Sequence, residues 1–170
     1  MKRLMFLLII GCSFFNILGQ EDHSDSFNHK NSAQIEVGGH GLFYSLNYER
    51  ILINGSQFKT TAQGGISFYP KHTGVRDFWM PIVVNELFSF TKHHLELGVG
   101  HVFIREATRD MENNPINWYW SGVFTGRIGY RYQQPAGRII IRVGFTPFLE
   151  YEDQYKEFYP SGGIAFGYNF

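Results

Sequence analysis

Apolar and polar residues alternate with a period of two along most of the chain. Between residues 163 and 170 every second position is large and apolar, and the positions between are small or polar. The large positions are Ile164, Phe166, Tyr168 and Phe170. Because successive side chains of a strand point to opposite faces, this pattern predicts a β-strand with one apolar face. An open apolar edge promotes aggregation, whereas closure of a membrane barrel pairs the strand and lipid covers its apolar face.

Similar segments occur throughout the chain. The predicted strands span residues 42–53, 58–69, 78–90, 94–105, 117–132, 138–151 and 159–170. The alternation is clearest in the fifth of these, where Trp118, Trp120 and Phe124 share one face. The third is apolar on both faces, so its orientation stays open, and Pro81 within it removes a ladder hydrogen bond.

The number of strands depends on residues 33–53, where the alternation changes phase. The apolar face falls on odd positions at Val37 and on even positions at Leu46. A shift of one residue exchanges the faces of a strand, so Gly38–Gly41 is either a bulge or a tight turn. A turn adds a strand at about residues 29–38, and the resulting even number is typical of outer-membrane barrels. We therefore favour eight strands over seven, with one long bulged strand as the alternative.

The connections alternate between short turns and longer polar loops. The short turns are predicted at residues 54–57, 91–93 and 133–137, and the long loops at 70–77, 106–116 and 152–158. Outer-membrane barrels have short periplasmic turns and long external loops. In that orientation Trp118 and Trp120 lie at the outer interface, and Tyr130 and Tyr132 lie at the inner one. The sequence thus predicts an all-β, antiparallel up-and-down transmembrane β-barrel.

The first residues are typical of a secretory signal peptide. Residues 1–19 have a basic start and an apolar stretch that is too short for a membrane helix. A lipoprotein signal with Cys12 as the lipidated residue is the alternative, but the apolar region continues past that cysteine. We therefore expect a signal peptide at 1–19, a flexible polar tail at 20–32 and a barrel domain at 33–170.

The composition excludes several classes of function. Charged and aromatic residues each make up 18% of the chain, and 19 glycines suit a barrel with aromatic girdles. Removing the leader takes away Lys2 and Arg3, which leaves 13 of the 15 basic residues against 15 acidic ones. A nucleic-acid-binding protein would show a basic face. Cys12 is the only cysteine and lies in the leader, so disulfides, thiol nucleophiles and cysteine zinc sites are excluded. No cofactor and no metal site are predicted.

Charged side chains are expected in the barrel interior. The candidates for ion pairs in the lumen are Glu96, Arg127, Arg131, Arg142 and Glu150, together with Glu49 and Lys59. Eight strands leave an interior just wide enough for side chains to fill, and buried charges must pair. We interpret the set as a structural plug and expect Glu96 to pair with Arg127 or Arg131. A narrow channel for small solutes, or an anionic ligand held by the arginines, is the alternative.

The catalytic candidates are weak. Small outer-membrane barrels that modify lipid A use His with Ser near the outer rim, and here His101 and Ser121 lie on neighbouring predicted strands. The alternation places His101 on the lipid face and Ser121 inside, so a direct hydrogen bond is not expected. His72 and Asp77 share a predicted loop, and His93 and His94 sit at a turn, as an interface pair rather than a metal site. We predict no enzymatic activity, with a lipid-modifying enzyme as the alternative.

Five segments carry a resemblance to a known group of proteins. They read GLFYSLNYERIL, HLELGVG, GYRYQ, RVGFTPF and GGIAFGYNF. With them the chain resembles small outer-membrane β-barrel proteins of Gram-negative bacteria, of the eight-stranded OmpA/OmpX-like kind.

This resemblance implies localisation in the bacterial outer membrane, contact with outer-membrane lipid, and handling by periplasmic chaperones and the barrel-insertion machinery. In such proteins the terminal strand is the insertion signal, which would be Phe166, Tyr168 and Phe170 here. The resemblance carries over no catalytic or ligand-binding residue. We expect a monomer that does not bind nucleic acid.

Overall fold

The computed structural model describes residues 26–69, 78–109, 115–152 and 155–170. The elements are β1 (Asn31–Gly38), the 3-10 helix η2 (Gly39–Gly41), β2 (Tyr44–Asn54), β3 (Phe58–Phe68), β4 (Phe78–Phe90), β5 (His93–Arg109), β6 (Pro115–Gln133), β7 (Ile139–Phe145), β8 (Phe148–Glu152), β9 (Tyr155–Tyr159) and β10 (Gly162–Asn169). No helix in this part of the chain is long and apolar enough to cross a membrane.

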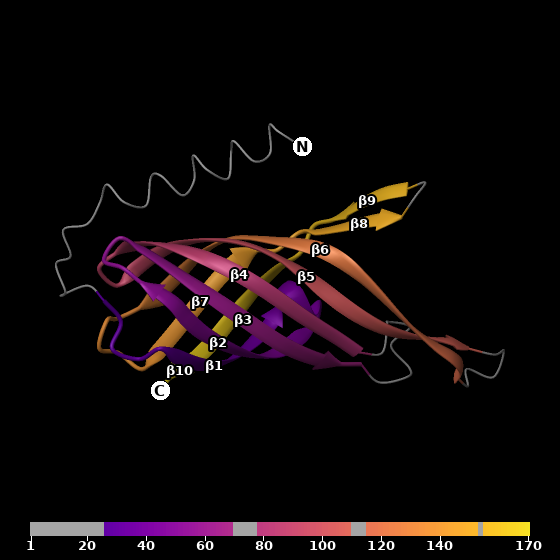
Figure 1. Ribbon diagram of the computed structural model, residues 1–170, viewed down its shortest axis with the longest axis horizontal. Coiled ribbons are helices and arrows are strands. Elements are labelled where there is room, and N and C mark those ends of the chain that lie inside the picture. Colours follow the sequence, from indigo (N-terminus) through magenta and orange to yellow (C-terminus); the bar gives the residue numbers. More distant parts are fainter. Residues whose placement is uncertain (1–25, 70–77, 110–114, 153–154) are drawn as a thin grey trace.

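The strands form one antiparallel sheet that closes on itself (Figure 1). From β1 to β7 each strand pairs with the next, and β10 pairs with β7 on one side and with β1 on the other. Eight strands therefore make the wall, and the hairpin of β8 and β9 extends it beyond β6. The predicted all-β up-and-down barrel is confirmed. The sheet has ten strands, and eight of them make the closed wall.

The change of phase near residue 40 is a turn rather than a bulge. Gly38 and Gly39 have φ angles of 75° and 66°, in the left-handed region that glycine adopts without strain. A Cβ on Gly38 would also lie 2.3 Å from the carbonyl oxygen of Gly162, so this position is closed to side chains. The chain reverses here, and the three residues of η2 are buried.

The alternation predicts the two faces of the wall correctly in most strands. In β3 the residues at odd positions are buried and those at even positions face outward. The orientation of β4, which the sequence left open, is now fixed, because Val83 and Leu87 are buried whereas Ile82 and Val84 are about half exposed. The pairing of β4 with β3 is interrupted beside Pro81, which has no N–H to donate.

Two loop predictions are wrong in part. The segment 152–158 was expected to be a polar loop, but Tyr155–Tyr159 forms β9 and pairs with β8. The segment 106–116 was also expected to be a loop, but β5 continues to Arg109 and β6 begins at Pro115. The two strands of this hairpin satisfy each other's backbone N–H and C=O groups beyond the closed wall. They therefore need no alternation of apolar and polar residues by which the sequence could predict them. The third predicted loop, 70–77, lies outside the described residues.

Candidate functional site in the barrel interior

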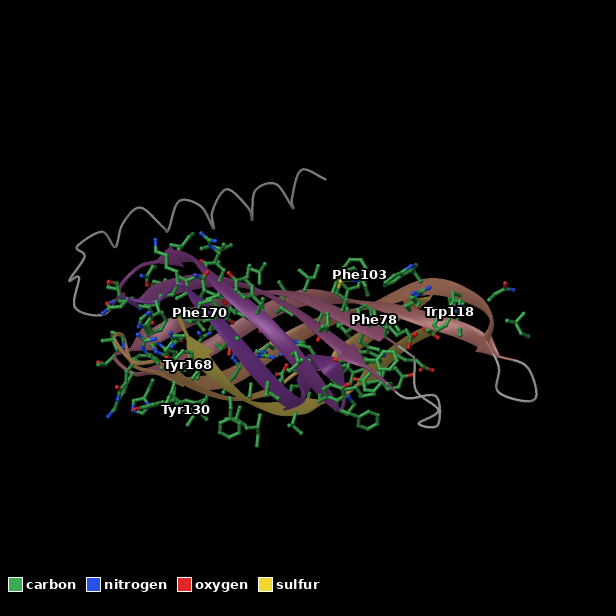
Figure 2. The ribbon with its side chains drawn as sticks, turned by 90° about the horizontal axis from the view of Figure 1, so that it is seen from below. Phe78, Phe103, Trp118, Tyr130, Tyr168 and Phe170 are labelled. Atoms are coloured by element: carbon green, nitrogen blue, oxygen red, sulfur yellow. The ribbon has the colours of Figure 1, made fainter. Side chains whose placement is uncertain are left out.

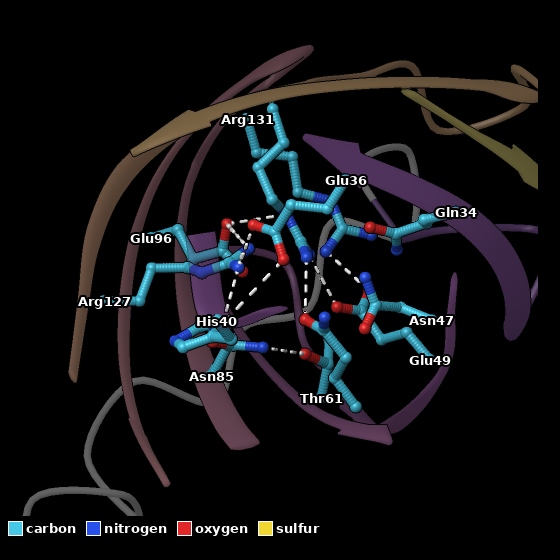
Figure 3. Close-up of polar contacts among 12 residues, drawn as sticks. Gln34, Glu36, His40, Asn47, Glu49, Thr61, Asn85, Glu96, Arg127 and Arg131 are labelled. Carbon is cyan, nitrogen blue, oxygen red and sulfur yellow. Dashed lines mark hydrogen bonds and ion pairs between the residues drawn. The ribbon is translucent and has the colours of Figure 1, made fainter. Parts of the chain in front are cut away.

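The inward side chains form three layers along the barrel. Register places a small apolar group at the end with the short turns, a charged group in the middle and a second apolar group at the far end. The middle layer contains five of the seven predicted lumen residues, and Glu36 of β1 joins them. Their side chains converge from β1, β2, β5, β6 and β7 (Figure 3).

Glu49 is the centre of the charged layer. One of its carboxylate oxygens accepts a hydrogen bond from Arg131 at 2.6 Å, and the other accepts one from Arg142 at 2.5 Å. All three side chains are about 1% exposed. Each oxygen of this carboxylate thus accepts from a different guanidinium group. The negative charge between the two cations offsets their mutual repulsion at short range.

Two further carboxylates complete the charge balance. Glu96 lies 2.9 Å from Nε of Arg142 and 3.9 Å from Nη1 of Arg127. Glu36 lies 2.5 Å from Nη2 of Arg127, a pairing that the sequence analysis missed. Three carboxylates thus face three guanidinium groups in a space closed to solvent. The predicted pair of Glu96 with Arg127 is present, but the long Arg142 side chain, which the prediction did not include, reaches Glu96 from β7 and lies closer to it.

His40 joins this layer from the turn between β1 and β2. Its Nε2 donates to the carbonyl oxygen of Gly126 at 3.2 Å, and its Nδ1 accepts a hydrogen bond from Arg127 at 2.8 Å. The imidazole is fully buried. The turn that reverses the chain therefore also delivers a side chain into the interior, where it helps to orient Arg127.

Two of the predicted inward residues lie outside the charged layer. Glu150 is on β8, where it pairs across the hairpin with Glu157, beyond the closed wall. Lys59 is buried nearer the short turns and donates to the carbonyl oxygen of Ser56 and to Ser89. The alternation gave both residues an inward face, but it carries no information on how far along the barrel each one lies.

Phe27 closes the lumen at the end with the short turns. This residue was assigned to a flexible tail, yet its ring is 3% exposed and clusters with Ile51 and Leu87. Its ring also makes an edge contact with His94, with centroids 5.2 Å apart. The two backbone polar groups of Phe27 are satisfied by the side chain of Asn54, at 3.0 and 2.9 Å. Phe27 thus packs into the barrel interior.

An apolar cluster occupies the far end of the lumen. It consists of Tyr69, Trp79, Val102, Ile104, Val123 and Phe148, with Leu42 packed against it. Trp79 makes edge contacts with Tyr69 and Phe148, with ring centroids 6.0 and 5.7 Å apart. Burial of these side chains stabilises the interior through the hydrophobic effect, whereas in the charged layer ion pairs offset the desolvation of the buried charges.

The catalytic candidates do not meet. The ring of His101 packs on the outer surface against Phe103 and Phe124, with centroids 4.6 and 5.1 Å away. Ser121 instead donates to Glu106 at 2.5 Å. His72 and Asp77 lie outside the described residues. Among the residues that are described, no group of three or more His, Cys, Asp or Glu side chains is arranged to hold a metal ion.

The histidine pair at the β4–β5 turn is divided between the two faces. His93 lies on the outside, where its Nδ1 is 2.6 Å from the hydroxyl of Tyr130. His94 is buried and contacts Ser89 and the carbonyl oxygen of Gln133, each at 2.9 Å. The proposed insertion-signal residues Phe166, Tyr168 and Phe170 all face outward and are 50–61% exposed.

Comparison with known proteins gives a fold and no family. No protein-family model and no curated protein sequence matches this chain. Among solved structures, the crystal structure of the N-terminal β-barrel domain of OprF from Pseudomonas aeruginosa superimposes with a TM-score of 0.57 at 10% sequence identity. The match covers 85% of this chain and 99% of that domain. At this identity the likeness supports the barrel architecture alone.

Proposed function

We propose that this protein is an integral outer-membrane β-barrel whose lumen is filled by its own side chains, and that its role is structural or surface-binding. The observation that carries the proposal is the reversal of polarity between the two faces of the wall. Arg131 and Glu49 are buried inside, while Val99 and Phe166 are 72% and 61% exposed outside. A soluble barrel would have the opposite arrangement.

The aromatic side chains on the outer face support a membrane location (Figure 2). Tyr130 lies near the short turns and Trp120 lies ten residues away on the same strand, where it packs against Phe78. Strands that tilt by about 35–45° rise roughly 2.5 Å per residue along the axis, so these two rings are about 25 Å apart in height. That height equals the apolar band of outer-membrane barrels, which is flanked by aromatic girdles.

Membrane fractionation tests the location. We expect the protein to be recovered with outer membranes after urea and carbonate washes. We also expect it to migrate faster on gels before heating than after, because a folded barrel resists detergent until it is heated. Recovery as a monomer in the soluble periplasmic fraction would contradict the proposal, and so would migration that is independent of heating.

Planar-bilayer recordings test the filled lumen. The unmodified barrel is expected to show only small conductance, because the paired charges and the two apolar clusters occupy the interior. Replacing Arg142 by Ser shortens the side chain that touches both Glu49 and Glu96, so conductance should rise several-fold. Arg138→Ser is the matched control, since Arg138 is exposed. A wide and steady pore in the unmodified protein would exclude this model.

A further inference from the structure

Exposed cations collect at one end of the barrel. Lys30, Arg50, Lys92 and Arg138 lie at the end with the short turns, and all four side chains are exposed. We call these four residues the basic arc. The described acidic side chain nearest this end on the outer face is the half-buried Glu86, which accepts a hydrogen bond from Thr60 at 2.8 Å.

The strands described at the opposite end hold more acidic than basic residues. Four acidic residues lie in the strands there, Glu106, Glu150, Glu152 and Glu157, against three basic ones, Arg105, Arg109 and Lys156. Arg105 stacks over the ring of Trp118 at 4.6 Å. The two ends of the barrel therefore differ in net charge. Among the described residues, no ion pair joins the basic arc to an acidic side chain.

Tyrosine side chains flank the basic arc on the outer wall. Arg138 donates to the hydroxyl of Tyr168 at 2.9 Å and lies over its ring, 5.6 Å from the centroid. On the other side of β10, Tyr48 of β2 donates its hydroxyl hydrogen to the side chain of Asn31 at the start of β1. Asn31 lies opposite Arg50 in the pairing of β1 with β2. Arg50 and Arg138 are separated by β1 and β10, so about 14 Å of aromatic-lined wall lies between them.

We propose that the basic arc binds the anionic headgroups of phospholipids in the leaflet at this end of the barrel. The inference rests on the proposed membrane location and adds a ligand class to it. Guanidinium groups bind phosphate through two parallel hydrogen bonds, and tyrosine rings are favoured at the level of lipid headgroups. A phospholipid fits better than a free phosphate, because its acyl chains continue along the apolar outer wall below the arc.

A site-resolved titration tests this proposal. The full chain is refolded in zwitterionic micelles, and the Nε–H signals of Arg50 and Arg138 are followed by NMR on addition of dihexanoyl-phosphatidylglycerol or dihexanoyl-phosphatidylcholine. One Lys or Arg near an anionic surface contributes an attraction equivalent to about a five-fold change in affinity. We expect the anionic lipid to bind at least about five-fold more tightly than the zwitterionic one, with the preference reduced at 1 M salt.

Charge variants separate this site from general lipid binding. The double variant Arg50→Gln and Arg138→Gln should lose the preference, measured by backbone shifts of Asn31 and Asn169, and the matching pair of Lys variants should keep most of it. Arg105→Gln, at the opposite end, should change nothing. Equal binding of the two lipids would overturn the proposal, as would an equal loss in Arg105→Gln or equal shifts with inorganic phosphate.

The membrane location itself can fail separately. A chain that shows no heat-dependent migration after refolding has not formed a membrane barrel, and the headgroup site is then excluded together with the location. A chain that folds into zwitterionic micelles but shows no lipid preference keeps the proposed location and loses only the headgroup site.

Discussion

Replacing Glu49 by Gln should lower the free energy of unfolding by about 3–5 kcal/mol, the usual loss when one partner of a buried ion pair is removed. Glu49 accepts hydrogen bonds from two of the buried arginines, Arg131 and Arg142. The neutral amide keeps the size of the side chain but leaves three guanidinium groups facing two carboxylates. Their repulsion is weakly screened in the interior because the layer is closed to solvent.

Urea unfolding of the refolded barrel in lipid vesicles, followed by gel migration and tryptophan fluorescence, measures this loss. Glu157→Gln on the exposed hairpin removes the same charge from a solvated position and should change stability by less than about 0.5 kcal/mol. Equal stability of the two variants would show that the charged layer contributes little to folding.

A double variant identifies the origin of the effect. Adding Arg131→Gln to Glu49→Gln removes one cation along with the carboxylate, so the double change should cost less than the sum of the two single changes. Contacting charged residues typically show coupling energies of about 0.5–3 kcal/mol. Additive losses would instead mean that the two side chains act through packing.

The wall of the barrel could be predicted from the sequence, because the alternation of apolar and polar residues within a strand shows which side chains face outward. In β6 the large residues Trp118, Trp120 and Phe124 share one face, and Ser121, Thr125 and Arg127 share the other. Most of this strand could therefore be assigned to the inside or the outside without knowledge of its neighbours. The same local rule fails in β4, where residues on both faces are apolar. There the pairing with β3 and β5 decides the orientation.

Positions along the barrel axis could not be predicted in the same way. Whether Glu96 meets Arg127, Arg131 or Arg142 depends on strand register and on how far a long side chain reaches across the lumen, and neither property is local. Glu36 could have been found, because it lies between the outward-facing Ile35 and Val37. Its pairing with Arg127 across the barrel depends on closure of the first strand against the last.

Two elements of the interior come from segments with no periodicity at all. His40 enters the lumen only because the turn around it bends inward, and a histidine among glycines carries no sign of that direction. Phe27 is a single aromatic residue in a polar segment. Its burial follows from the fit of its ring beside Ile51 and Leu87 at the mouth of the lumen. That Phe27 closes this end of the lumen thus depends on strands that meet only in the folded barrel, and the local sequence does not show it.

A basic substitution on the outer face should be costly at mid-height and tolerated near the interface. Val99 projects outward from β5, and it lies six residues above His93, which is level with the tyrosine girdle. That spacing corresponds to a height of roughly 15 Å, close to the middle of an apolar band of about 25 Å. Val99→Arg should therefore destabilise the barrel by about 2–4 kcal/mol, because the guanidinium must leave water for hydrocarbon.

Leu95→Arg is the matched control on the same strand and the same face. This position is two residues from His93, so the long side chain reaches the headgroups and the expected loss is about 0–1 kcal/mol. Both variants are compared with the unmodified protein by urea titration in vesicles of phosphatidylcholine. A loss that grows with depth identifies lipid as the solvent of the outer face. If both substitutions are neutral, the outer face is in contact with water, and the apolar residues on it need a different explanation from the one proposed here.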